Sequence, residues 1–306
     1  MSRLDPSREL RDFLDVMDAR AELARDSESM LPEQDRNTNR YSGIQPRDKS
    51  IPERNLPDAH SSSTRGVLYD RDRGYRTSPS EIRSMAELGK FRAIGENDLE
   101  EYLYGGQRKA LQSDIHDLLR QGLVRRATFQ GPEGAPRELL TLTKRGHRLL
   151  RASQMVSADQ VTYSGFVKPR EANHDAELYR LYQNEASRIE QKGGRVRRVI
   201  LDFEIKRKIY RDLARLGSQA RPEIAERHGL RVVRNKIPIP DLQIEYETRD
   251  GDAARVNLEL VTEHYRHRHV AEKARAGFSL YTPRGESDKL RRVLDQQELT
   301  AEILSL

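Results

Sequence analysis

The clearest hydrophobic pattern in the chain lies near its C-terminal end. Between residues 241 and 246 the apolar side chains occupy the even positions and the polar ones the odd positions, which is the period-two signature of a strand with two different faces. The stretch 256–261 alternates in the same way. The two stretches are separated by Arg249-Asp250-Gly251-Asp252, a turn signal. The pattern therefore predicts a β-hairpin.

The polar face of this hairpin carries the first candidate site. If the polar faces of the two strands coincide, Asp241 and Glu259 lie side by side. Two carboxylates that converge at the end of a sheet suit a hard divalent cation such as Mg²⁺ or Mn²⁺. Ordinary solvated acids explain the same spacing, and from spacing alone that interpretation is the more common one.

Upstream, a helical period predicts a compact helical unit. Ser78-Pro79-Ser80-Glu81 is a capping box with proline at the first helical position, so a helix begins there. A helix over 107–121 would bury Leu111 and Ile115 on one face and leave a polar face open. The elements expected in order are the helix from Ser78, helices at 98–103 and 107–121, strands at 123–129 and 138–143, and a helix at 144–153.

This order, together with the segments RQGLVRR and LTLTKRGHRLL, resembles the winged helix-turn-helix of bacterial DNA-binding proteins. The resemblance implies that helix 107–121 enters a major groove of double-stranded DNA. Arg108, Lys109 and Gln112 would then reach base edges or phosphates, and Arg137 in the wing would hold the DNA backbone. A winged helix that serves only as a scaffold or a protein contact is the alternative.

The second half of the chain predicts alternating helices and strands. Asn173-His174-Asp175 begins a helix that ends at Gly193-Gly194. His174 is a candidate catalytic base, although a histidine at a helix start is more often a packing or capping group. The elements expected next are a strand over 195–205 with Val199, Leu201 and Phe203 inward, an exposed basic helix at 206–215, the hairpin, a helix at 270–278, a strand at 279–283 and a helix at 288–297.

Pro240-Asp241, Glu259 and the helix that follows them resemble the core of the PD-(D/E)xK nuclease-like superfamily. The whole order looks like the replication-relaxation family of plasmid and other mobile-element proteins. The resemblance implies Asp241 and Glu259 as metal ligands. The superfamily lysine two residues after the glutamate is Val261 here, so Lys273 in the following helix is the catalytic candidate. The segment Glu263–His269 holds three histidines between arginines, a pattern that favours a phosphate-facing turn over a metal site.

The predicted fold is thus α+β and α/β, with a winged helix-turn-helix domain followed by a restriction-endonuclease-like αβ domain. The expected boundaries are an N-terminal amphipathic helix at 1–28, a flexible tether at 29–70, the winged helix at 71–153, a linker at 154–172 and the nuclease-like domain at 173–306. Proline and polar residues dominate 29–66, which indicates disorder. The isolated helix at 1–28 would need a partner surface, in this chain or on another protein.

Composition narrows the function. The 306 residues carry a formal charge of +6, which suits a polyanionic partner. The chain has no cysteine, which excludes disulfides and thiolate metal sites and favours a cytoplasmic protein. No apolar run of about 18 residues is present, so a membrane partner is not expected.

The leading hypothesis is a DNA-binding protein of a plasmid or other mobile element that acts in replication, mobilisation or DNA processing, with Mg²⁺ or Mn²⁺ as the cofactor if it cleaves DNA. The alternatives are a non-catalytic regulator whose nuclease-like domain serves for docking, and an accessory subunit of a larger DNA-processing complex. A homodimer is compatible with each of these hypotheses.

Overall fold

The computed structural model describes residues 65–131, 134–261, 267–282, 287–295, 299 and 301–305. These residues mix helices and strands, in agreement with the predicted mixture of α and β structure. The expected helix at 1–28, most of the expected tether and most of the histidine-rich segment 263–269 lie outside the described residues. No helix in the described part of the chain is long and apolar enough to cross a membrane.

We call residues 65–153 the three-stranded region. The capping box at its first helix is confirmed, because the Glu81 amide donates to Ser78 Oγ at 3.1 Å and the Ser78 amide donates to Glu81 Oε2 at 2.7 Å. Its helices are α2 (Pro79–Phe91), α3 (Glu96–Tyr104), α4 (Arg108–Arg120) and α5 (Lys144–Ser153). Its antiparallel sheet has the order β3 (Ile94–Gly95), β5 (Pro136–Leu142), β4 (Val124–Gln130).

Regular structure begins earlier than the sequence pattern predicts. Residues placed at the end of the tether form β1 (Gly66–Asp70), which pairs with β2 (Arg73–Thr77) in a separate antiparallel hairpin. Leu68 of β1 and Tyr75 of β2 are buried, and Arg148 of α5 donates to Asp70 at 2.9 Å. Two five-residue strands are too short for an alternation to stand out in the sequence.

We call residues 169–305 the five-stranded region. Its sheet has the order β10-β9-β8-β7-β6, with β8, β9 and β10 parallel and the other pairs antiparallel. The strands are β6 (Arg195–Leu201), β7 (Leu242–Glu247), β8 (Ala253–Leu260), β9 (Ser279–Thr282) and β10 (Ile303–Ser305). The helices are α6 (Pro169–Gln191), α7 (Asp202–Leu216), α8 (Arg221–Arg227), α9 (His267–Arg275) and α10 (Ser287–Asp295). The sequence pattern did not predict β10.

The prediction of a strand through residue 205 was wrong. The strand β6 ends at Leu201, and α7 begins at Asp202. Two acids in the first turn suit the positive end of the helix dipole. Each of them also pairs with a lysine one turn later, Asp202 with Lys206 at 2.7 Å and Glu204 with Lys208 at 2.6 Å. These i,i+4 pairs favour a helix over an extended strand.

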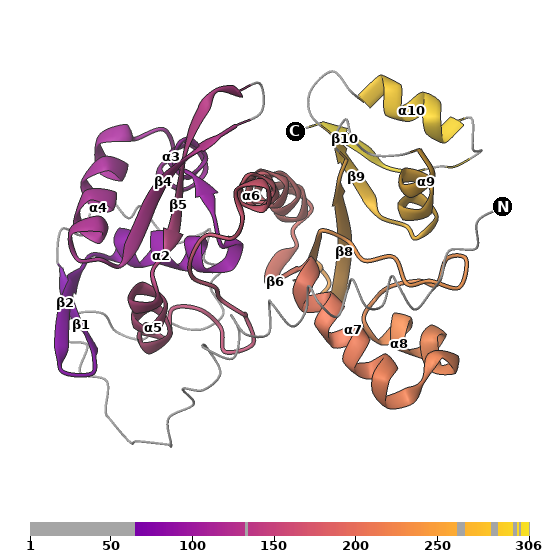
Figure 1. The fold of residues 1–306 in the computed structure, drawn as a ribbon, viewed down its shortest axis with the longest axis horizontal. Coiled ribbons are helices and arrows are strands. Elements are labelled where there is room, and N and C mark those ends of the chain that lie inside the picture. Colours follow the sequence, from indigo (N-terminus) through magenta and orange to yellow (C-terminus); the bar gives the residue numbers. More distant parts are fainter. Residues whose placement is uncertain are drawn as a thin grey trace. The chain divides into compact units, whose positions relative to one another are not determined.

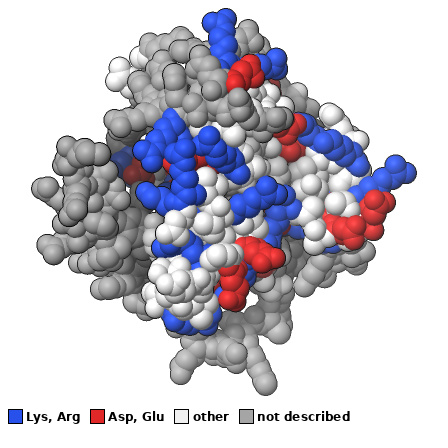
Figure 2. Space-filling view, turned by 90° about the vertical axis from the view of Figure 1, so that its right-hand side faces the viewer, with Lys and Arg blue, Asp and Glu red and all other residues white. Residues whose placement is uncertain are grey.

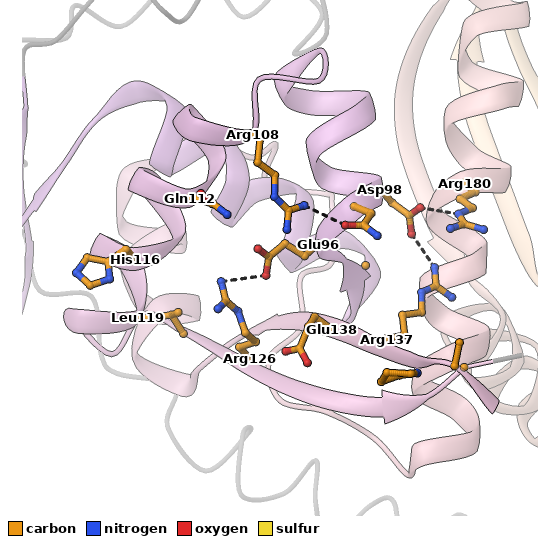
Figure 3. Close-up of a pocket in the computed structure, with 15 residues that line it drawn as sticks. Glu96, Asp98, Arg108, Gln112, His116, Leu119, Arg126, Arg137, Glu138 and Arg180 are labelled. Carbon is orange, nitrogen blue, oxygen red and sulfur yellow. Dashed lines mark hydrogen bonds and ion pairs between the residues drawn. The ribbon is translucent and has the colours of Figure 1, made fainter.

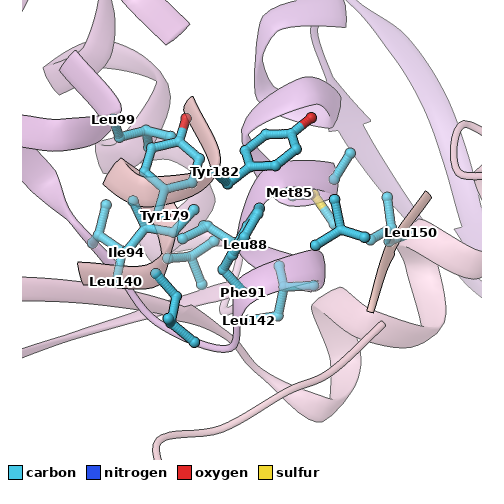
Figure 4. Close-up of a cluster of buried hydrophobic side chains, with 14 of the residues drawn as sticks. Met85, Leu88, Phe91, Ile94, Leu99, Leu140, Leu142, Leu150, Tyr179 and Tyr182 are labelled. Carbon is cyan, nitrogen blue, oxygen red and sulfur yellow. The ribbon is translucent and has the colours of Figure 1, made fainter. Parts of the chain in front are cut away.

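Helix α6 packs against both sheets (Figure 1). Its Tyr179 and Tyr182 lie against Phe91 of α2, with ring centroids 5.2 and 5.0 Å apart. Figure 4 shows these two tyrosines among the buried side chains of the three-stranded region. The same cluster continues to Leu242 and Leu258 of the five-stranded sheet. One apolar core therefore runs through α6 and ties the two regions together.

Candidate functional site

The register of the β7–β8 hairpin brings the two predicted metal ligands to one place. Leu242 pairs with Leu258, and Gln243 pairs with Asn257. Asp241 lies two residues before Gln243, and Glu259 lies two residues after Asn257. The same antiparallel register therefore puts Asp241 opposite Glu259 on the polar face of the hairpin. The side chains of Gln243 and Asn257 on this face already meet at 2.7 Å.

Lys273, the predicted catalytic residue, reaches Glu259 from α9. Its Nζ lies 2.7 Å from Oε1 and 2.8 Å from Oε2 of Glu259, and it also donates to the carbonyl oxygen of Ile239 at 2.5 Å. The Glu259 side chain is fully buried. A buried carboxylate requires a compensating charge, and Lys273 supplies it from the following helix.

Asp241 lies in a different set of contacts. Its Oδ2 accepts a hydrogen bond from the Leu260 amide at 2.9 Å, and its Oδ1 lies 3.7 Å from Nε2 of His174. Burial alone would raise the pKa of Asp241, but His174, the Lys273 charge and the Leu260 amide outweigh it and hold the pKa below its ordinary value. Burial also lowers the pKa of His174, and the contact with Asp241 outweighs that effect and raises it. These contacts favour the ionised form of the Asp241 carboxyl group.

Next to His174, an arginine from the three-stranded region enters the same neighbourhood. Arg92 donates to Asp175 Oδ1 at 2.6 Å, and its guanidinium lies 4.4 Å from the centre of the Phe203 ring. Burial raises the pKa of Asp175 to about 6, although Arg92 opposes this shift. Arg92 was not among the predicted site residues. Nothing in the sequence around Arg92 indicates that it pairs with Asp175, because Asp175 is distant in the chain.

The two carboxylates fit a hard cation. Mg²⁺ is commonly held by one or two carboxylates, with water and substrate phosphates as the remaining ligands. Among the described residues no three His, Cys, Asp or Glu side chains group as a metal site, so Asp241 and Glu259 would be the protein's contribution. Glu259 would share its oxygens between the cation and Lys273.

A second candidate site lies on α4. This helix buries Leu111, Ile115 and Leu118 and leaves the predicted DNA-binding residues Arg108, Lys109 and Gln112 exposed. The Nη1 of Arg108 donates to Glu100 Oε2 at 2.6 Å and to Asn97 Oδ1 at 3.1 Å. The Arg108 side chain is still 48% exposed, so about half of its surface faces solvent.

The α4 face borders a pocket of about 640 Å³ between α3, α4 and the β4–β5 hairpin. In Figure 3, Arg108 and Gln112 border it from α4, and Arg126 of the hairpin pairs with Glu96 at 2.9 Å. Arg126 was not among the predicted residues. No local signal separates it from its neighbour Arg125, because the two adjacent arginines belong to opposite faces of β4 and only the folded chain shows which of them borders the pocket.

Arg137, expected to contact the DNA backbone, is engaged elsewhere. Its Nη2 donates to Asp98 at 2.7 Å and its Nη1 to Glu177 of α6 at 2.5 Å, and its side chain is only 15% exposed. Asp98 also accepts from Arg180 of α6 at 2.6 Å. Figure 3 shows both arginines meeting at Asp98. This geometry gives Arg137 a structural role between α3, β5 and α6.

No protein-family model, curated protein or solved structure matches the chain.

Proposed function

We propose that the protein binds double-stranded DNA through a winged helix-turn-helix within residues 71–153, in the manner of the replication-relaxation proteins of plasmids and other mobile elements. The observation that supports this most directly is the exposed face of α4, where Arg108, Lys109 and Gln112 stand clear of the core. In this proposal α3 and α4 are the helix-turn-helix, and the β4–β5 hairpin is the wing.

The chemistry of the α4 face suits a nucleic acid. Arginine and lysine contact phosphates, and arginine and glutamine also form paired hydrogen bonds with guanine and adenine edges in the major groove. Among the described residues, the hydrogen-bond partners of Arg108 are Glu100 and Asn97, and both bind Nη1. Within that part of the chain, Nε and Nη2 can donate together to a base or a phosphate.

The test is to replace Arg108 and Lys109 together with alanine. We expect weaker binding to a DNA duplex. The slope of log affinity against log salt concentration should become shallower by about one to two units, because each lost phosphate contact removes about 0.9 units of this slope. Binding is measured by mobility-shift titration over a series of salt concentrations. The charge-matched control is Lys192→Ala/Arg249→Ala, at the far end of the five-stranded sheet. An unchanged slope in the α4 variant would show that α4 does not contact DNA.

We use the name acid–lysine cluster for Asp241, Glu259 and Lys273. This cluster favours a second function, the hydrolysis of phosphodiester bonds by a nuclease-like domain. In that function Asp241 and Glu259 would hold Mg²⁺ or Mn²⁺, and the cation would polarise the scissile phosphate and activate water. Lys273 would stabilise the negative charge that develops on the phosphate. The competing interpretation is a docking module. Val261 in the usual lysine position and the closed Glu259–Lys273 pair favour the docking module.

Divalent cations separate these two interpretations. If Asp241 and Glu259 bind the metal, the melting temperature should rise with Mg²⁺ or Mn²⁺ in the parent protein but not in Asp241→Asn or Glu259→Gln, because a ligand stabilises the state that binds it. Nicking of supercoiled DNA in Mn²⁺ reports cleavage directly. A parent protein that shows neither effect is a binding module without nuclease activity.

A further inference from the structure

A tight turn in the five-stranded region holds an arginine in an unfavourable backbone conformation. Val233 and Lys236 form a two-residue β-bridge, with amide-to-carbonyl distances of 2.8 and 3.0 Å. The two residues between them, Arg234 and Asn235, have φ of 50° and 61°. Two consecutive left-handed residues define a type I′ turn, which asparagine tolerates and glycine prefers. Arginine at the first position is unfavourable for folding.

The turn is fixed between two helices. Asn235 Oδ1 accepts from Arg221 of α8 at 2.8 Å, and Arg234 lies 3.4 Å from Glu272 of α9. The segment 231–236, which we call the basic turn, thereby presents Arg231, Arg234 and Lys236 to solvent. A strained and exposed arginine that is held in place from both sides indicates a binding role more than a folding role.

The surface around the basic turn has an excess of positive charge. Glu272 is shared by Arg234 and by Arg268, whose side chain is 75% exposed. Within the described part of the chain, neither Arg231 nor Lys236 contacts a carboxylate. Figure 2 views the molecule from the right-hand side of Figure 1, and several blue Lys and Arg side chains gather among the described residues of that side. An excess of exposed cations fits a polyanion.

The basic turn lies at the same end of the sheet as the acid–lysine cluster. Four residues lie between Lys236 and Asp241 in the chain, and within that connection the Ile239 carbonyl accepts from Lys273, which also contacts Glu259. DNA phosphates on the basic turn would therefore lie beside Asp241 and Glu259, on a different element from α4.

We propose that the basic turn is a second contact for the backbone of duplex DNA, which holds the duplex beside the Asp241–Glu259 pair while α4 reads the groove. This inference rests on the proposed DNA-binding function. It adds a second, sequence-independent surface to that function, because phosphate contacts give affinity without base recognition.

The first experiment compares two charge-matched variants of the full chain on one mixed-sequence DNA duplex. Arg231→Ala/Lys236→Ala removes two cations of the basic turn that contact no carboxylate among the described residues. Lys192→Ala/Arg249→Ala removes two cations from the opposite end of the hairpin, about 20 Å away for strands of this length. We expect the first variant to lose on the order of tenfold in affinity and about two units of salt slope, and the control to change little.

The second experiment separates binding from folding. Arg234→Gly places glycine at the left-handed position, so the melting temperature should rise by about 2 °C as the backbone strain is removed. The same variant should bind the duplex more weakly, since it lacks one cation. A residue with a purely structural role would not change stability and affinity in opposite directions.

The outcomes are distinguishable. If the parent chain does not bind duplex DNA, the proposed function fails and this inference fails with it. If the parent binds DNA, and the basic-turn variant and the matched control retain equal affinity and slope, only the inference is overturned. A loss of affinity for a matched RNA duplex but not for the DNA duplex would overturn it as well.

Discussion

The α4 face and the acid–lysine cluster hold charged side chains in opposite ways. On α4, Lys109 and Gln112 are exposed, and Arg108 uses one terminal nitrogen for contacts within the protein. In the cluster, Glu259 has both oxygens on Lys273. The exposed face can bind a ligand with little rearrangement. The buried cluster must give up or share the Glu259–Lys273 contact before it binds a cation. Binding of DNA at α4 would therefore cost less free energy within the protein than binding of a cation at the cluster.

The largest expected effect comes from breaking the buried pair. Lys273→Met leaves Glu259 as a buried charge without its lysine, so we expect a loss of about 3–5 kcal/mol in the free energy of unfolding. Denaturant unfolding monitored by circular dichroism measures it.

The control is the double variant Glu259→Met/Lys273→Met. It removes both charges and should lie within about 2 kcal/mol of the parent, because a buried ion pair contributes little net stability over apolar residues of similar size. Equal losses in the single and double variants would show that Lys273 acts through packing and not through its charge.

A smaller effect distinguishes the two arginines that were predicted together as DNA contacts. Arg137→Ala removes two partly buried ion pairs and should cost about 2 kcal/mol in the free energy of unfolding, since Asp98 keeps Arg180. It should leave the salt slope of DNA binding unchanged. Arg108→Ala should show the reverse, with unchanged stability and a slope reduced by about one unit. Chemical denaturation and salt titrations of both variants measure this.

If Arg137→Ala reduced the slope as much as Arg108→Ala, Arg137 would release Asp98 and Glu177 to contact DNA, and the structural role assigned to it would be wrong.

Local signals predicted most elements and part of each site. The capping box at Ser78 marked the start of α2, and helical periodicity marked α4 within one residue at each end. Strand alternation put Asp241 and Glu259 on the polar faces of their strands, and the observed register of the hairpin shows that these two faces coincide. Lys273 followed from the resemblance to nuclease-like proteins, which indicated that a lysine should approach from the next helix.

What the sequence did not predict depends on contacts between distant segments. In the sequence Arg137 is an ordinary strand residue, and its role depends on Asp98 and Glu177, which converge on it in the fold. Strand β10 is three residues long and forms only by pairing with β9, so no local period marks it. Arg92 lies far from Asp175 in the chain, and only the packing of α2 against α6 brings them together.

The smallest expected effect tests whether Glu100 competes with DNA for Arg108. Glu100 accepts from Arg108 at 2.6 Å, whereas its neighbour Glu101 is exposed on the same helix. Both Glu100→Gln and Glu101→Gln remove one negative charge from α3. If phosphate must displace the Glu100 carboxylate, Glu100→Gln should raise duplex affinity by about two- to threefold and Glu101→Gln by less. Mobility-shift titrations at low salt resolve this difference. Weaker binding in Glu100→Gln alone would show instead that Glu100 holds Arg108 in its binding orientation.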